Sequence, residues 1–99
     1  MLEEWRIVPG YLGRYEVSNF GQVRSVSGRK PTLLKQVPSG HGHAVVKLYL
    51  HGFGTTKRVH TLVWSLFHTG FFTAVYHKDG NLSNNRLDNL TLEREVENV

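Results

Sequence analysis

The chain has 99 residues, of which 39% are apolar, and a formal net charge of +4. This length is typical of a single globular domain, so we expect no multi-domain enzyme. The sequence contains no cysteine, which excludes disulfides and zinc sites made by thiolates. Its apolar runs are only a few residues long and its N-terminal residues lack an apolar signal core. We therefore expect no membrane span and a cytoplasmic location.

Charge is distributed unevenly along the chain. Residues 1–16 sum to −1 and residues 79–99 to −3, whereas the 62 residues between them carry eight basic side chains and no carboxylate. Such a stretch indicates a polyanionic partner, most simply nucleic acid, because cations beside phosphates release condensed counterions. The alternative is a basic surface that only keeps the protein soluble.

The first half of the sequence predicts short antiparallel strands separated by Gly and Pro. A hairpin turn is expected at residues 18–21, where Asn19 and Gly21 tolerate the positive φ of a tight turn. The expected strands cover residues 5–8, 14–17, 22–26 and 32–36.

A strand and a helix are expected in the middle of the chain. Residues 44–50 alternate between two faces, which predicts a strand, and a basic strand returns over residues 55–59. Apolar residues with helical spacing then predict an amphipathic helix over residues 59–67 that Gly70 ends. His60 lies in this helix, where we expect it to be packed rather than to bind a ligand.

Residues 71–76 are mostly apolar and predict another strand, which places His77 at its end. The last quarter of the chain is rich in asparagine, which favours side-chain hydrogen bonds that hold irregular backbone. A terminal helix is expected from Glu93 to Val99, with Thr91 as its N-cap. The sequence thus predicts an α+β fold.

His77 is the residue best suited to chemistry, because an imidazole can take a proton from water at neutral pH. Asp79 lies two residues on, and Asn89 and Asn98 follow in the loop and the terminal helix. This order suits a base beside an oxygen-ligated divalent ion. The spacing alone favours a simpler interpretation, in which Asp79 and Gly80 form a hairpin turn that the asparagines cap.

Two longer strings give the sequence a family resemblance. Residues 75–90, VYHKDGNLSNNRLDNL, resemble the HNH motif of homing endonucleases from phages and introns, and RVHTLVWSLF resembles the helix that leads into it. The N-terminal string EEWRIVPGYLGRYEVSNFGQVRS resembles the NUMOD4 module that often precedes this motif. The matched segments span residues 3–98.

The resemblance implies a NUMOD4-like, β-rich DNA-contacting module over residues 1–56. It also implies a ββα-metal finger with its leading helix over residues 57–99. The implied activity is hydrolysis of a DNA phosphodiester in a phage-infected bacterial host. One base and one metal serve one strand at a time, so a monomer would nick one strand of double-stranded DNA.

The same resemblance implies the roles of individual residues. His77 matches the general base, and Asn89 matches the asparagine that holds the loop through backbone hydrogen bonds. Asn98 matches a ligand of one divalent ion, Mg²⁺ or Mn²⁺. Tyr76 stands where relatives often have Asp or Asn as a second metal ligand. We expect Asp79 to supply this second ligand instead. This departure leaves an alternative function, a degenerate relative that binds DNA or a protein without cleavage.

Basic residues on the expected strands are candidates for phosphate contacts along a sheet laid in a DNA groove. The alternative is that they are solvent-facing strand ends. Arg86 lies inside the motif, where it could reach a phosphate or form a salt bridge to Asp88 or Glu93. The candidate DNA-binding residues are Arg24, Lys47, Lys57, Arg58 and Arg86.

Overall fold

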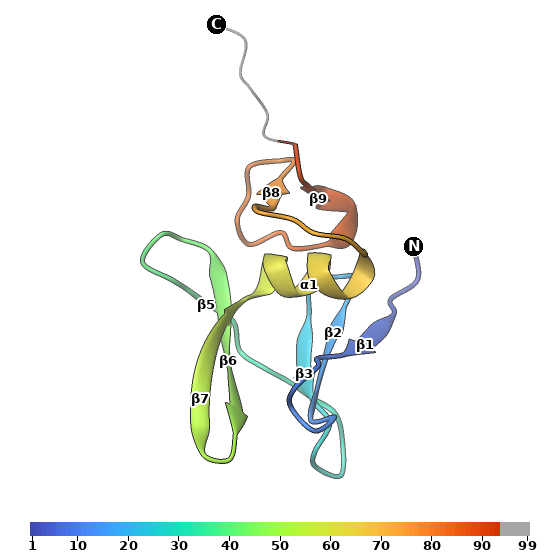
Figure 1. Cartoon of the computed structure of the whole chain (residues 1–99), viewed down its shortest axis with the longest axis vertical. Helices are drawn as coiled ribbons and strands as arrows, with labels where there is room; N and C mark the ends of the chain where they lie inside the picture. The colour runs from blue at the N-terminus through green and yellow to red at the C-terminus, as the bar shows by residue number, and fades with distance from the viewer. Residues whose placement is uncertain (94–99) are drawn as a thin grey trace, which may run out of the picture.

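The computed structural model describes residues 1–93 of the chain. In this range the strands form three antiparallel sheets beside one α-helix (Figure 1). No helix among these residues has the length and apolar character that crossing a bilayer requires. The antiparallel sheets and the helix confirm the α+β class. The terminal helix that would complete a ββα finger, apart from Glu93, falls outside the described residues, as does Asn98.

The first sheet contains four strands in sequence order. They are β1 (Trp5–Ile7), β2 (Tyr15–Ser18), β3 (Val23–Ser25) and β4 (Thr32–Leu33). β2 and β3 form the predicted hairpin around residues 18–21, and Gly21 has a φ of 84°. The strand expected over residues 32–36 keeps only two residues, because its ladder with β3 joins only Thr32 to Ser25 and Leu33 to Arg24.

The second sheet consists of β5 (Val37–Pro38), β6 (Ala44–Leu50) and β7 (Phe53–Arg58). The prediction of a strand over residues 44–50 is confirmed, and its alternation follows burial: Val46 and Leu48 are buried, whereas Lys47 is exposed. β7 begins two residues earlier than the sequence predicted, because the ladder with β6 extends to Phe53.

The helix α1 (Val59–Phe67) begins directly after β7 and covers the predicted apolar stripe. The prediction that Gly70 ends it is wrong, because His68 is the C-cap and has an extended conformation. It lies between the two larger sheets and the small hairpin of β8 (Tyr76–His77) and β9 (Leu90–Thr91) (Figure 1). A 3-10 turn, η1 (Leu87–Asn89), precedes β9 and contacts α1. The helix therefore connects the N-terminal sheets with the segment that carries His77.

The strand expected over residues 71–76 is wrong for most of its length. Only Tyr76 and His77 are in a strand, since they pair with Thr91 and Leu90. The preceding apolar residues have no partner strand in the described part of the chain, and Phe71 is 91% exposed. An apolar run predicts a strand only where a second strand is available to pair with it.

The core is formed by the two larger sheets and the inner face of α1. Its most deeply buried apolar side chains are less than 2% exposed: Val17, Val23, Val46, Leu48, Val59 and Val63. His60 is also buried, at 3% exposure, as predicted. These contacts fix α1 and, through it, the position of the elements that follow.

Leu48→Ala tests this core. Leu48 is fully buried, so the substitution leaves a cavity and should lower the free energy of unfolding by about 2–5 kcal/mol, measured by urea denaturation. Leu33→Ala is the control, because Leu33 is 59% exposed and its loss should change stability by less than about 1 kcal/mol. Equal effects of the two substitutions would contradict this description of the core.

Candidate active site around His77

His77 is the second residue of β8 and its side chain is half-buried. Its Nε2 atom lies 2.6 Å from Oδ1 of Asn85, a residue that is only 3% exposed. An amide oxygen accepts hydrogen bonds and cannot donate them, so in this arrangement Nε2 carries the proton. The other ring nitrogen, Nδ1, then has a free lone pair and can accept a proton.

The loop after His77 is held by a network centred on Asp79. Oδ1 of Asp79 accepts bonds from the backbone N–H of Asn81 and from Nδ2 of Asn89, each at 2.8 Å. Its Oδ2 accepts a bond of the same length from Nδ2 of Asn84. These three donors lower the pKa of Asp79 to about 2, with Asn84 contributing most. Asp79 is therefore a carboxylate at neutral pH.

Asn89 closes this network onto the backbone. Its Oδ1 accepts a bond from the Asp79 N–H at 3.2 Å, and its Nδ2 donates to the carbonyl of Asn84 at 2.8 Å. The backbone carbonyl of Asn89 also accepts the N–H of Lys78 at 2.7 Å. Asn89 therefore makes hydrogen bonds of the kind expected of it, while its part in a reaction stays a prediction.

Two further histidines lie beside His77. The ring of His60 stacks on that of His43 with 4.5 Å between their centroids, and its centroid is 5.1 Å from that of His77. Burial, followed by the charges of His43, His77 and Arg58, lowers the pKa of His60 to about 4. Burial also lowers the pKa of His43, helped by Arg58. Both rings are thus uncharged at neutral pH.

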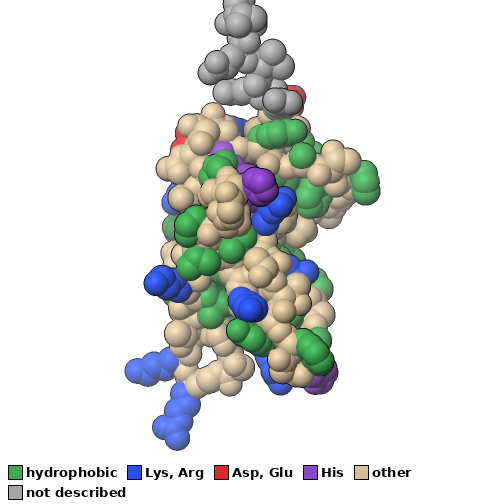
Figure 2. Space-filling view, turned by 90° about the vertical axis from the view of Figure 1, so that its left-hand side faces the viewer, with side chains coloured by type: hydrophobic (Ala, Val, Ile, Leu, Met, Phe, Trp, Pro, Cys, Tyr) green, Lys and Arg blue, Asp and Glu red, His purple; other side chains and the backbone are tan. Residues whose placement is uncertain are grey.

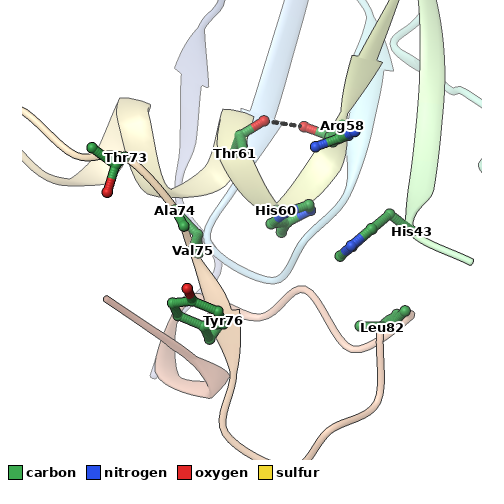
Figure 3. A pocket seen from close by; sticks show the side chains of 9 residues that line it. All are labelled: His43, Arg58, His60, Thr61, Thr73, Ala74, Val75, Tyr76 and Leu82. Atoms are coloured by element: carbon green, nitrogen blue, oxygen red, sulfur yellow. Dashed lines mark hydrogen bonds between the residues drawn. The ribbon is translucent and has the colours of Figure 1, made fainter. Parts of the chain in front are cut away.

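A cavity of about 400 Å³ opens beside this cluster (Figure 3). Figure 3 shows His43 and His60 on one side of it and Tyr76 and Leu82 on the other. Its lining residues are His43, Arg58, His60, Thr61, Thr73, Ala74, Val75, Tyr76 and Leu82. The cavity thus lies between the start of α1 and Tyr76, the residue next to His77.

The candidate metal ligands are only partly assembled in the described part of the chain. Asn98 lies outside it, and residues 1–93 contain no group of three His, Asp or Glu side chains that could hold an ion. Asp79 provides negative charge, but its oxygens already accept three hydrogen bonds. Tyr76 places a phenol in the cavity wall. The described residues alone therefore do not fit a complete metal site.

The five candidate DNA-binding residues are not on one surface. Lys47 pairs with Thr56 and Arg58 with Val45, so Lys47 and Arg58 share one face of the second sheet, whereas Lys57 pairs with buried Val46 on the other. Figure 2 views the molecule from the side of this sheet. Lys and Arg side chains project along that side, and acidic atoms are visible only near its upper end.

Arg24 and Arg86 have partners within the chain. Arg24 forms an ion pair with Glu16 at 2.7 Å and its guanidinium lies 3.8 Å from the ring centroid of Trp5. The Nε atom of Arg86 is 3.5 Å from Asp88, one of the two acidic partners considered from the sequence. These contacts make the two arginines less available to phosphates than Lys47 and Arg58.

The sequence does not predict that Asn85, His43 and His60 lie beside His77. The density of asparagines indicated a hydrogen-bonded loop but not which member faces the histidine. No sequence pattern places His43 on His60, because His43 lies just before β6 and His60 lies in α1, with β6 and β7 between them in the chain.

Comparison with known proteins agrees with this architecture. Residues 3–49 match the NUMOD4 motif. The chain is 43% identical over 89 residues to DNA endonuclease I-HmuI of Bacillus phage SP01, covering 88% of this chain and 50% of that protein. A solved structure described as DNA binding and cleavage by the HNH homing endonuclease I-HmuI superimposes with a TM-score of 0.77 at 41% identity. That match also covers 88% of this chain and 50% of the other.

The chain thus spans about half the length of the relative that it matches. Within that span the sequence identity, the NUMOD4 match and the structural superposition all indicate the same type of protein. Over 88% of its length the chain is similar to an HNH homing endonuclease, and its residues 3–49 match the NUMOD4 motif.

Proposed function

We propose that the chain is a metal-dependent DNA endonuclease that nicks one strand of a duplex, with His77 as its general base. The observation that carries this proposal is the 2.6 Å contact of His77 Nε2 with Asn85, which leaves Nδ1 as the proton acceptor. The similarity to I-HmuI supports DNA as the substrate, since that protein's structure is described as one of DNA binding and cleavage.

In the proposed reaction His77 Nδ1 takes a proton from a water molecule. The water oxygen forms a bond to phosphorus while the bond from phosphorus to the 3′ oxygen breaks, and the leaving oxygen takes a proton from solvent. Asn89 keeps the loop around Asp79 in place, which holds His77 against the DNA.

The proposed cofactor is one divalent ion, Mg²⁺ or Mn²⁺, with Asn98 and Asp79 as the proposed ligands. When bound, such an ion would stabilise negative charge on the phosphate and the leaving 3′ oxygen. Asp79 suits this role through its charge at neutral pH, since its pKa is about 2. Its three hydrogen bonds also give it a role in holding the loop, which does not depend on the ion.

Double-stranded DNA is the proposed partner, and the face of the second sheet with Lys47 and Arg58 is its proposed main contact. Lys57, Arg24 and Arg86 are proposed as secondary contacts because they lie on another face or have partners within the chain.

We propose that the chain has two parts, a DNA-contacting module (residues 1–56) and a finger with its leading helix (residues 57–99). We also propose that the monomer acts inside a phage-infected bacterial cell.

A second candidate function is binding without cleavage, favoured by Tyr76. Its side chain lines the cavity next to His77, at the position where a carboxylate or amide ligand would be expected. A neutral phenol is a poor ligand for Mg²⁺. This function predicts salt-dependent affinity for DNA with no product.

His77→Ala tests the proposed base. The chain should convert supercoiled plasmid to open circles in Mg²⁺ or Mn²⁺, and the substitution should lower the rate by at least about 100-fold, since the base is lost. The measurement is single-turnover nicking resolved on agarose gels.

The matched control is His68→Ala, which removes an exposed imidazole that stacks on Trp64 after the end of α1. It should nick at the rate of the unaltered chain. Nicking by His77→Ala at that same rate would refute the role of His77. Tight DNA binding by the unaltered chain without nicking would favour the second candidate.

Lys47→Ala and Lys57→Ala test which face of the second sheet meets DNA, because these lysines point to opposite faces. The affinity for duplex DNA should fall with salt, and Lys47→Ala should reduce the slope of log affinity against log salt by about one. Lys57→Ala should reduce it less. Fluorescence anisotropy at several salt concentrations measures both slopes, and a larger effect of Lys57→Ala would place the DNA on the other face.

A further inference from the structure

We infer that Asn85 is a positioning residue that fixes the orientation and tautomer of His77, and that the N-terminal turn at residues 18–21 holds Asn85 in place. This inference deepens the proposed function and rests on it for its effect on reaction rate. Its structural part, the state of the His77 ring, can be tested separately.

Asn85 contacts the ring of His77 directly. β8 has only two residues, so its ladder with β9 fixes the backbone of His77 but not the rotation of its ring. The bond from Nε2 to Oδ1 of Asn85, at 2.6 Å, is the contact that fixes this rotation. Because Oδ1 only accepts, the bond also places the ring proton on Nε2.

Asn85 is only 3% exposed and packs against the N-terminal turn. A Cβ atom added to Gly21 would lie 2.7 Å from the backbone carbon of Asn85 and 2.8 Å from its carbonyl oxygen. Such distances are far below van der Waals contact, so the turn approaches the Asn85 backbone as closely as only a glycine permits. A φ of 84° imposes the same requirement on this position.

Residues next to Gly21 and Asn85 add further contacts between the turn and the loop. The carbonyl of Asn19 accepts the N–H of Leu87 at 2.8 Å. The guanidinium of Arg86 lies 4.2 Å from the ring centroid of Phe20. Three successive residues of the turn, 19–21, therefore contact three successive residues of the loop, 85–87.

The turn itself is held by side-chain hydrogen bonds. Ser18 is fully buried, and its Oγ accepts the N–H groups of Phe20 and Gln22 at 3.1 and 3.2 Å. The side chain of Asn19 ties the turn to the N-terminal segment, with Oδ1 accepting from Glu4 N–H and Nδ2 donating to the Leu2 carbonyl. A turn in the NUMOD4 segment thus controls the ring of His77 without touching it.

Asn85→Leu and Asn85→Asp test the first part. Leucine removes the acceptor at similar volume, whereas aspartate keeps an acceptor. Within residues 1–93, Nδ2 of Asn85 has no hydrogen-bond partner whose loss would complicate the comparison. NMR of the full 99-residue chain with ¹⁵N-labelled histidine should show an imidazole proton on Nε2 of His77 in the unaltered chain and in Asn85→Asp. That signal should be lost in Asn85→Leu, because an unbonded imidazole proton exchanges rapidly with water.

Single-turnover nicking of supercoiled plasmid gives the second readout. Asn85→Leu should be slower by about 10–100-fold, the usual effect of losing a residue that orients a reactive histidine, and Asn85→Asp should recover most of the rate. A proton on Nδ1 of His77 in the unaltered chain would overturn the inference. So would an unchanged Nε2 signal in Asn85→Leu. If Asn85→Leu does not fold, the ring proton in the unaltered chain and in Asn85→Asp decides.

Gly21→Ala and Gly10→Ala test the second part as a matched pair. Both glycines have a φ of 84°, so alanine introduces the same backbone strain. Only at Gly21 would the new Cβ meet Asn85, since no atom of the described residues lies within 4 Å of a Cβ at Gly10. Gly21→Ala should lose the Nε2 proton signal and slow nicking, whereas Gly10→Ala should keep both. Identical results for the two variants would refute the contact.

These readouts separate the inference from the proposed function. If the unaltered chain binds DNA but does not nick it, the proposed function fails, while the NMR signals of His77 still decide the role of Asn85. If the chain nicks but the signals do not respond to Asn85 or Gly21, the function stands and this inference fails.

Discussion

The hydrogen bond between His77 and Asn85 is the contact on which the candidate site depends. A strand of two residues cannot orient a side chain by itself, and the ladder between β8 and β9 joins only two pairs of residues. The orientation of His77 therefore comes from outside its own strand. The chain supplies it from a buried amide, which is in turn packed against a turn near the other end of the sequence. The rigid N-terminal sheet thus stabilises a segment that has little regular structure of its own.

Side-chain hydrogen bonds replace secondary structure in the loop between β8 and η1. Asp79 accepts three of them. The side chain of Asn89 accepts the N–H of Asp79 and donates to the carbonyl of Asn84. Amide side chains can donate and accept at once, which explains why asparagine is so frequent there. A loop built in this way has its backbone held by side chains rather than by a strand ladder.

The sequence predicted those parts of the fold that depend on local periodicity. The bounds of α1 and β6 follow from apolar spacing, because one face of each is buried in the same core. The strand over residues 71–76 was wrong, since an apolar run does not reveal whether a partner strand exists. The motif led to His77, Asp79 and Asn89, and the hydrogen-bond partners of their side chains lie within ten residues along the chain. It did not predict that Asn85 packs against Gly21 or that His43 stacks on His60, because these contacts join residues distant along the chain.

In the proposed complex the ring of His77, bonded through Nε2 to Asn85, presents its free nitrogen Nδ1 to a DNA phosphate. A crystal structure of the chain with a duplex that carries a non-cleavable phosphate analogue would test it most directly. We predict Nε2 of His77 on Asn85, Nδ1 directed at the analogue, and the duplex lying along the sheet face with Lys47 and Arg58. A duplex bound elsewhere, or a His77 ring that has left Asn85 and turned away from the phosphate, would contradict it.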